Sequence, residues 1–207
     1  EIALRAQPDN GGWWFNLGLL HKARLAFREG LDANLRARAL LGNQKGVLWN
    51  LSICATALGE GQTAVDSLRS LGHDAKLAPS GMPYVDGLPP VQVRAASIGS
   101  GLGPDTAVPE RAVGFELLWV TPISPCHGVV SSPSFRDASI DYGDVVLWEP
   151  VPLGISEHDG RPVPRFALLA VLKKGNEHRF RYVALEQEPQ QVAALARDLP
   201  ENCQLFV

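Results

Sequence analysis

The sequence predicts an α+β protein, with helical hairpins at the N-terminus followed by a mainly antiparallel β domain that carries one C-terminal helix. Up to residue 78, apolar residues recur at spacings of three and four, as the buried face of a helix requires. Residues 76–90 then contain four prolines and two glycines, which end any helix. From residue 91 on, short β-branched and apolar runs alternate with polar residues. We therefore expect helices in 1–78, a linker in 79–90 and a β-rich domain in 91–207.

Two short segments in the helical part echo each other. Trp-Phe-Asn-Leu-Gly at 14–18 aligns with Leu-Trp-Asn-Leu-Ser at 48–52. The first contains the motif Trp-x2-Leu-Gly, and the second is followed by Ala64-x3-Leu68. In spacing and in motif, residues 1–78 resemble the tetratricopeptide repeat, a helix-turn-helix unit of about 34 residues. The offset from 14 to 48 is one such unit, and we call it the repeat length. The resemblance implies a surface that binds polypeptides rather than a reaction.

The helical elements are expected in the following order. Residues 1–10 resemble the end of a preceding repeat, because Pro8 stands where the family has the proline that closes each unit. Residues 13–43 predict two helices, and Val47–Leu58 and Gln62–Leu71 predict two more, with Gly59 and Gly72 at the helix ends.

The second helix of the first unit departs from the family pattern. If Ala33 and Ala37 are its small, close-packed positions, about three extra residues lie between Lys22 and Asp32.

The β-rich part is predicted from runs that favour strands and are separated by Gly, Pro, Asp and Asn. Residues 166–185 predict a hairpin, Pro189 begins an amphipathic helix, and residues 203–207 predict an edge strand. The expected strands cover residues 91–95, 115–120, 128–131, 144–148, 166–172 and 179–185.

Composition excludes several classes of partner. A net charge of -3 and a pI near 6.0 give no basic field for nucleic acid, and no apolar run reaches the roughly 18 residues of a membrane span. Three widely spaced cysteines, Cys54, Cys126 and Cys203, favour a reducing compartment, so we expect a cytoplasmic protein. The Arg-, Ala-, Gly- and Pro-rich, Lys-poor composition is typical of bacterial proteins. No phosphate-binding glycine loop or other cofactor motif is present, so no cofactor is expected.

The resemblance implies an adaptor that binds a protein or peptide partner in a concave groove lined by the first helix of each unit. An asparagine amide both donates and accepts hydrogen bonds, so Asn16 and Asn50 would form a ladder along the backbone of an extended peptide. Alternatively, the asparagines only reflect the repeat, and Phe15 and Trp49 only pack. The residues implied to line the groove are Phe15, Asn16, Leu19, Lys22, Trp49, Asn50 and Ile53.

A second candidate function is an accessory thiol-dependent or metal-dependent enzyme or maturation factor that uses the adjacent Cys126 and His127. A nearby imidazolium would favour the reactive thiolate. Neighbouring residues on a strand point to opposite faces, however, so a partner would have to come from elsewhere. A third interpretation is a buried cysteine in a turn stiffened by Pro125 and Gly128, with no catalytic or metal role. The residues considered as partners are His158, His178, Asp141 and Asp144.

Two repeats and a fragment are too few to cover their own apolar faces, because about three stacked units are needed for stability. We therefore expect the sheet-rich half to cover Val65, Leu68 and Leu71 of the second unit. The truncated end of the array exposes apolar surface, through which a homo-oligomer is expected to form if no other chain covers it.

Overall fold

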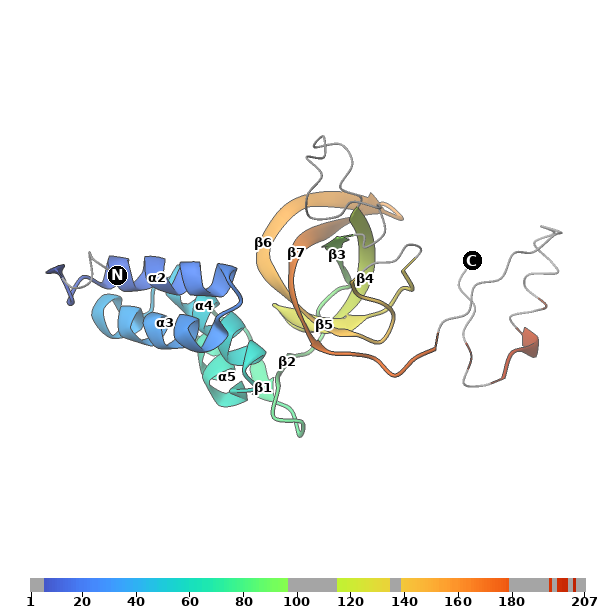
Figure 1. Ribbon diagram of the computed structural model, residues 1–207. Coiled ribbons are helices and arrows are strands. Elements are labelled where there is room, and N and C mark those ends of the chain that lie inside the picture. The colour runs from blue at the N-terminus through green and yellow to red at the C-terminus, as the bar shows by residue number, and fades with distance from the viewer. Residues whose placement is uncertain are drawn as a thin grey trace. The chain divides into compact units, whose positions relative to one another are not determined.

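The computed structural model describes residues 6–96, 115–134, 139–178, 194, 197–200 and 203 (Figure 1). Contacts divide the chain into residues 1–175 and residues 176–207. In the described part of the first unit, the helices come first and the strands follow, which confirms the predicted α+β class. The strand predicted at 179–185, the C-terminal helix and the strand predicted at 203–207 lie wholly or mostly outside the described residues.

The helices form two helix-turn-helix units whose helices begin at matching positions, although the second helix has 15 residues in the first unit and 10 in the second. Each helix of the second unit begins one repeat length after its counterpart in the first. The turns match as well, because the backbone N of Ala26 donates to the carbonyl of His21 at 2.9 Å and that of Glu60 donates to Ala55 at 2.9 Å. The similarity in sequence between residues 14–18 and 48–52 is therefore accompanied by a similarity in backbone structure. The four helices are α2 Gly11–Ala23, α3 Phe27–Leu41, α4 Lys45–Ala57 and α5 Gly61–Ser70.

The first unit has no extra residues, so the prediction of an insertion between Lys22 and Asp32 is wrong. The close-packed position of α3 is Gly30 rather than Ala33, and it corresponds to the fully buried Ala64 of α5. A Cβ atom at Gly30 would lie 3.1 Å from Sγ of Cys54, so only a very small residue fits there. The prediction was wrong because the small residue at the close-packed position of α3 is a glycine and not an alanine.

A short antiparallel hairpin covers α5. Its strands are β1 Ala75–Leu77 and β2 Pro83–Val85. Ala75 packs in one cluster with Val65 and Leu68 of α5, and Leu71 lies against the same cluster. The three residues expected to be covered are thus covered, but by this hairpin rather than by the larger β domain. Part of the stretch predicted as a linker is therefore folded.

The remaining strands close into a barrel in the order β3-β4-β5-β6-β7 (Figure 1). Successive strands are antiparallel, so the first and the fifth run in the same direction, and the pair that closes the barrel, β3 with β7, is parallel. Alternate residues of β3 are buried, which matches its predicted period of two. Trp148 is the largest fully buried side chain of the barrel core. The strands are β3 Val91–Ala96, β4 Phe115–Ser124, β5 His127–Val130, β6 Val145–His158 and β7 Arg161–Lys173.

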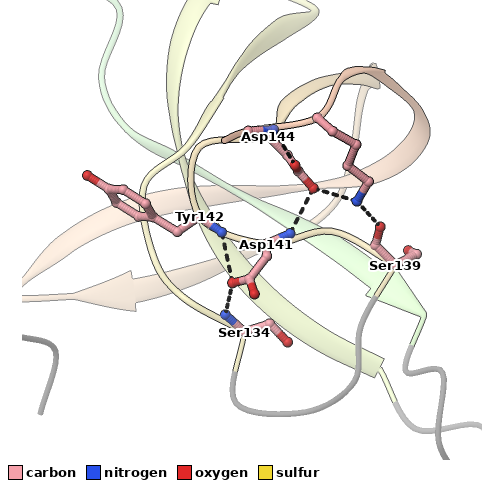
Figure 2. Close-up of polar contacts among 7 residues, drawn as sticks. Ser134, Ser139, Asp141, Tyr142 and Asp144 are labelled. Atoms are coloured by element: carbon pink, nitrogen blue, oxygen red, sulfur yellow. Dashed lines mark hydrogen bonds and ion pairs between the residues drawn. The ribbon is translucent and has the colours of Figure 1, made fainter. Parts of the chain in front are cut away.

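A buried carboxylate, Asp144, fastens the loop between β5 and β6 to the end of β7 (Figure 2). It accepts hydrogen bonds from the backbone N of Asp141 at 2.9 Å, from the backbone N of Gly175 at 2.9 Å and from Nζ of Lys174 at 2.8 Å. Burial alone would raise the pKa of Asp144, but these three bonds outweigh it and hold the pKa below its usual value. The residues labelled in the figure are Ser134, Ser139, Asp141, Tyr142 and Asp144.

The turn between α2 and α3 contains a strained residue, which gives a first prediction. Leu25 has φ 59° and is 49% exposed, whereas Gly59, its equivalent in the second unit, has φ 73°. A left-handed conformation costs an L-residue about 1–2 kcal/mol, a cost that glycine does not have. Glycine also gives the unfolded chain more conformational entropy, which disfavours the folded state by about 0.5–1 kcal/mol. Leu25→Gly is expected to raise the free energy of unfolding in urea by about 0.5–1 kcal/mol.

The matched control is Gly59→Leu, which introduces the same strain in the second unit and is expected to lower the free energy of unfolding. If Leu25→Gly lowers it as well, the leucine side chain makes stabilising contacts that exceed its backbone strain.

Candidate functional site

The seven residues expected to line a groove do not form one surface. Asn16 is exposed, and Phe15, Leu19 and Trp49 are half-buried. The other three, Lys22, Asn50 and Ile53, are buried against other parts of the chain.

The barrel covers Lys22 and Ile53. Nζ of Lys22, near the end of α2, lies 2.5 Å from Oε2 of Glu149 on β6. Ile53 of α4 is fully buried in one cluster with Cys126 and Leu147. These two residues therefore bind the barrel of their own chain, and in this conformation no partner peptide reaches them.

The amide of Asn50 joins the two units. Its Nδ2 donates to Oδ1 of Asn34 on α3 at 3.3 Å, and Nδ2 of Asn34 donates to the carbonyl of Gly30 at 2.7 Å. Asn50 is only 2% exposed, so the expected ladder of two asparagines facing a peptide is not present. Trp49 also packs within the chain. Its ring lies edge-on to His73 with the centroids 5.6 Å apart, next to the β1–β2 hairpin.

On α2, Asn16 is exposed and Phe15 and Leu19 are half-buried, so these members of the predicted groove are at least partly open. The ring edge of Phe15 lies beside Gly46 at the start of α4, where an added Cβ would lie 3.1 Å from the ring, and the side chain packs against the core cluster that contains Leu31 and Leu51. The residues predicted to line a groove are therefore at least partly exposed along the first part of α2 and buried where Lys22 meets Glu149.

The residues proposed for catalysis lie inside the molecule. Cys126 and His127 are 0% and 1% exposed. Nδ1 of His127 lies 2.6 Å from Oγ of Ser124, and Sγ of Cys126 lies 3.6 Å from the same oxygen and 3.8 Å from Oγ1 of Thr56. The cysteine and the histidine thus share a serine neighbour, and Thr56 of α4 ties the turn to the helices.

The protonation states of this cluster oppose nucleophilic chemistry. Burial raises the pKa of Cys126 to about 11 and lowers the pKa of His127 to about 4. At neutral pH the pair is a thiol and a neutral imidazole, not the thiolate and imidazolium of a reactive pair. The hydrogen bonds of the thiol go to Ser124 and Thr56 rather than to His158, His178, Asp141 or Asp144.

Metal binding at this turn has no support in the geometry. Within the described ranges, no group of three or more His, Cys, Asp or Glu side chains is arranged to hold a metal ion. The arrangement fits the third interpretation, a buried cysteine in a stiff turn. Nothing in the sequence indicated the roles of Thr56 and Glu149, because these residues act through contacts with distant parts of the chain, Cys126 and Lys22.

Comparison with protein-family models, with curated proteins and with solved structures found no match. Among the residues that the structure describes, no helix has both the length and the apolar character needed to cross a bilayer.

The contact between Lys22 and Glu149 gives a second prediction. The Lys22 side chain is 7% exposed and the Glu149 side chain 26%, so Glu149→Gln leaves a nearly buried ammonium without its counter-charge. We expect the free energy of unfolding to fall by about 3 kcal/mol, measured by urea denaturation.

The matched control is Glu60→Gln, which removes the partner of Arg28 in an exposed ion pair. This change is expected to cost less than about 1 kcal/mol. If the two substitutions lower the free energy of unfolding equally, water reaches Lys22 once Glu149 is replaced. The barrel would then not keep the Lys22 ammonium away from water.

The cysteines give a third prediction. Cys54 and Cys126 are buried and Cys203 is exposed. Burial also raises the pKa of Cys54, to about 12. In native protein at a pH of about 7.5, iodoacetamide is therefore expected to modify Cys203 and to leave the other two thiols intact, as measured by peptide mass spectrometry.

Unfolding in urea before alkylation is the control, and it should expose all three thiols. Rapid native alkylation of Cys126 would contradict the buried turn and would revive the thiol-enzyme hypothesis.

Proposed function

We propose that the protein is an adaptor that binds a partner polypeptide along α2, in the open part of the groove formed by Phe15, Asn16 and Leu19. One observation carries the proposal. The equivalents of these residues one repeat length later are Trp49, Asn50 and Ile53, and in α4 they are covered by the β1–β2 hairpin, by α3 and by the barrel. The same face of the next unit is therefore a surface that binds polypeptide, and on α2 it is open.

The chemistry of the open groove fits a peptide backbone flanked by apolar side chains. The Asn16 amide offers two donors and an acceptor, which pair with any extended backbone. Phe15 and Leu19 add apolar area beside it, and a ring that already packs against the core loses little entropy on binding.

The proposal includes a cytoplasmic location, supported by two reduced thiols, Cys54 and Cys126, buried without disulfides. The second candidate function, an enzyme or maturation factor centred on Cys126 and His127, is not favoured by any contact described around those residues. Their burial and their neutral states argue for a structural role.

The fourth prediction tests the groove. We expect a double variant, Asn16→Ala with Leu19→Ser, to retain the fold but to capture its partner from a lysate of producing cells at least about tenfold less well than wild type. Asn50→Ala is unsuitable for this purpose because it breaks the bond to Asn34 inside the array. The measurement is quantitative mass spectrometry of the retained proteins, with circular dichroism to verify the fold.

Two controls accompany it. Leu35→Ala changes an exposed leucine on α3, and Cys126→Ala changes the buried turn. Both are expected to keep the partner. If the double variant retains it as well as wild type does, the groove on α2 is not the binding surface and the proposal fails.

A further inference from the structure

The strands β6 and β7 extend as a hairpin past the strands that flank them. β5 pairs with β6 only up to Leu147, whereas β6 and β7 stay paired as far as His158 and Arg161. On the other side, β3 pairs with β7 no closer to this turn than Arg165. We call residues 154–164 the arm. Among the strands that the structure describes, none pairs with either outer edge of the arm.

The β7 edge of the arm is blocked by two prolines, Pro162 and Pro164. Proline has no N–H, so these residues occupy positions of β7 that donate nothing to β6, and their nitrogens face outward. Proline at such a position prevents another strand from pairing with an exposed edge. A further strand therefore cannot form a regular ladder with β7 here.

The β6 edge of the arm has no such block. In the register between the two strands, Ile155 lies opposite Pro164 and Glu157 lies opposite Pro162. Antiparallel pairs alternate between those that exchange hydrogen bonds and those that do not, and these two pairs are of the second kind. Ile155 and Glu157 therefore direct their backbone N–H and C=O groups away from β7. The β6 edge thus offers donors that the β7 edge lacks.

The barrel holds one face of the arm in place. Oγ of Ser156 donates to Oε1 of Gln92 on β3 at 2.8 Å, and the ring of His158 lies edge-on to Trp119 on β4, with the centroids 4.9 Å apart. Successive side chains of a strand point to opposite faces, so the odd-numbered residues of this stretch point away from the barrel. The β6 edge is therefore preorganised, and a strand that binds it does not have to order it.

The side chains on the open side of β6 are apolar at one end and acidic at the other. Val151, Leu153 and Ile155 occupy alternate positions and are 65%, 55% and 65% exposed. Towards the turn, Glu157 is exposed and the Asp159 side chain is 88% exposed. The proline opposite Glu157 carries no charge. A strand that fits this edge therefore has apolar side chains followed or preceded by a positive charge.

We propose that the β6 edge of the arm binds an extended segment of another protein as an additional antiparallel strand. The backbone of the segment bonds to Ile155 and Glu157, its apolar side chains lie beside Leu153 and Ile155, and a Lys or Arg lies opposite Glu157. In an antiparallel strand the residue opposite Glu157 comes first, so the basic residue precedes the apolar ones. Pro150 and Pro152 interrupt the donors of β6 before Leu153, so the segment is short.

Charge favours another protein over a second copy of this chain. Residues 149–159 contain no Lys or Arg, so a copy that paired through the same edge would bring no positive charge to Glu157. The inference does not rest on the proposed adaptor function, because the arm and the surface on α2 share no residue.

The test uses the full chain and two short peptides with blocked ends. Lys-Thr-Val-Thr-Val has the charge and the order that the edge requires, and Glu-Thr-Val-Thr-Val has the opposite charge. We expect the lysine peptide to bind with a dissociation constant below about 1 mM in fluorescence anisotropy, and the glutamate peptide to bind about threefold or more weakly. Absence of binding by the lysine peptide overturns the proposal, also where a part of the chain itself covers the edge.

Methylation of single peptide nitrogens tests for strand addition. The first valine lies opposite Ile155 and directs its N–H at the edge, so N-methylation there is expected to weaken binding by about tenfold. The N–H of the threonine before it points away from β6, and N-methylation there should change the affinity by less than about twofold. Equal losses from the two methylations would mean that the peptide does not bind as a strand, and the proposal would be wrong.

Substitutions in the chain locate the contact. Glu157→Lys is expected to reverse the preference, so that the glutamate peptide binds better than the lysine peptide. Ile155→Pro removes a donor that points away from β7, and it is expected to weaken binding about tenfold while circular dichroism stays unchanged. Leu35→Ala, which changes an exposed leucine of α3, should leave the affinity unchanged. A preference that Glu157→Lys does not alter places the peptide elsewhere and overturns the proposal.

Sedimentation tests the competing occupant, a second copy of the chain. We expect a monomer at micromolar concentration. A dimer that Ile155→Pro dissociates would show that the edge binds its own kind, and the proposal would then be wrong.

Discussion

The constraint on which the structure depends is that two helix-turn-helix units cannot cover their own apolar faces. The apolar residues of the second unit are covered by α3, by the β1–β2 hairpin and by the barrel. The β elements thus take the place of additional repeats.

The barrel contact combines two kinds of energy. Ile53 packs with Cys126 and Leu147 in a dry cluster, while Lys22 and Glu149 pair beside it. A nearly buried lysine is stable only with its counter-charge, so the ion pair fixes which part of β6 faces α2. The apolar packing stabilises this contact. The ion pair fixes how β6 lies against α2, because Lys22 is costly to bury without its counter-charge.

The sequence was informative wherever the signal is local. The echo of residues 14–18 at 48–52 and the apolar spacing predicted four helices, with bounds for α4 and α5 close to those observed, and Gly59 and Gly72 end their helices with the positive φ values of 73° and 95°. The strands beginning at Val91 and Phe115 were predicted from alternation and from apolar content. Burial of Lys22, Asn50 and Ile53 was not predictable, because their partners are far away in the chain and carry no motif, as Glu149 shows for Lys22.

The difference between the two units bears directly on function. Their first helices are equally long and their turns match, so differences in burial between α2 and α4 reflect what surrounds each helix and not how it folds. Every position that is exposed on α2 and buried on α4 therefore marks a surface for which the chain already contains a working example. On one side of α4 that example is a barrel and a hairpin, and on the other it is the helix α3.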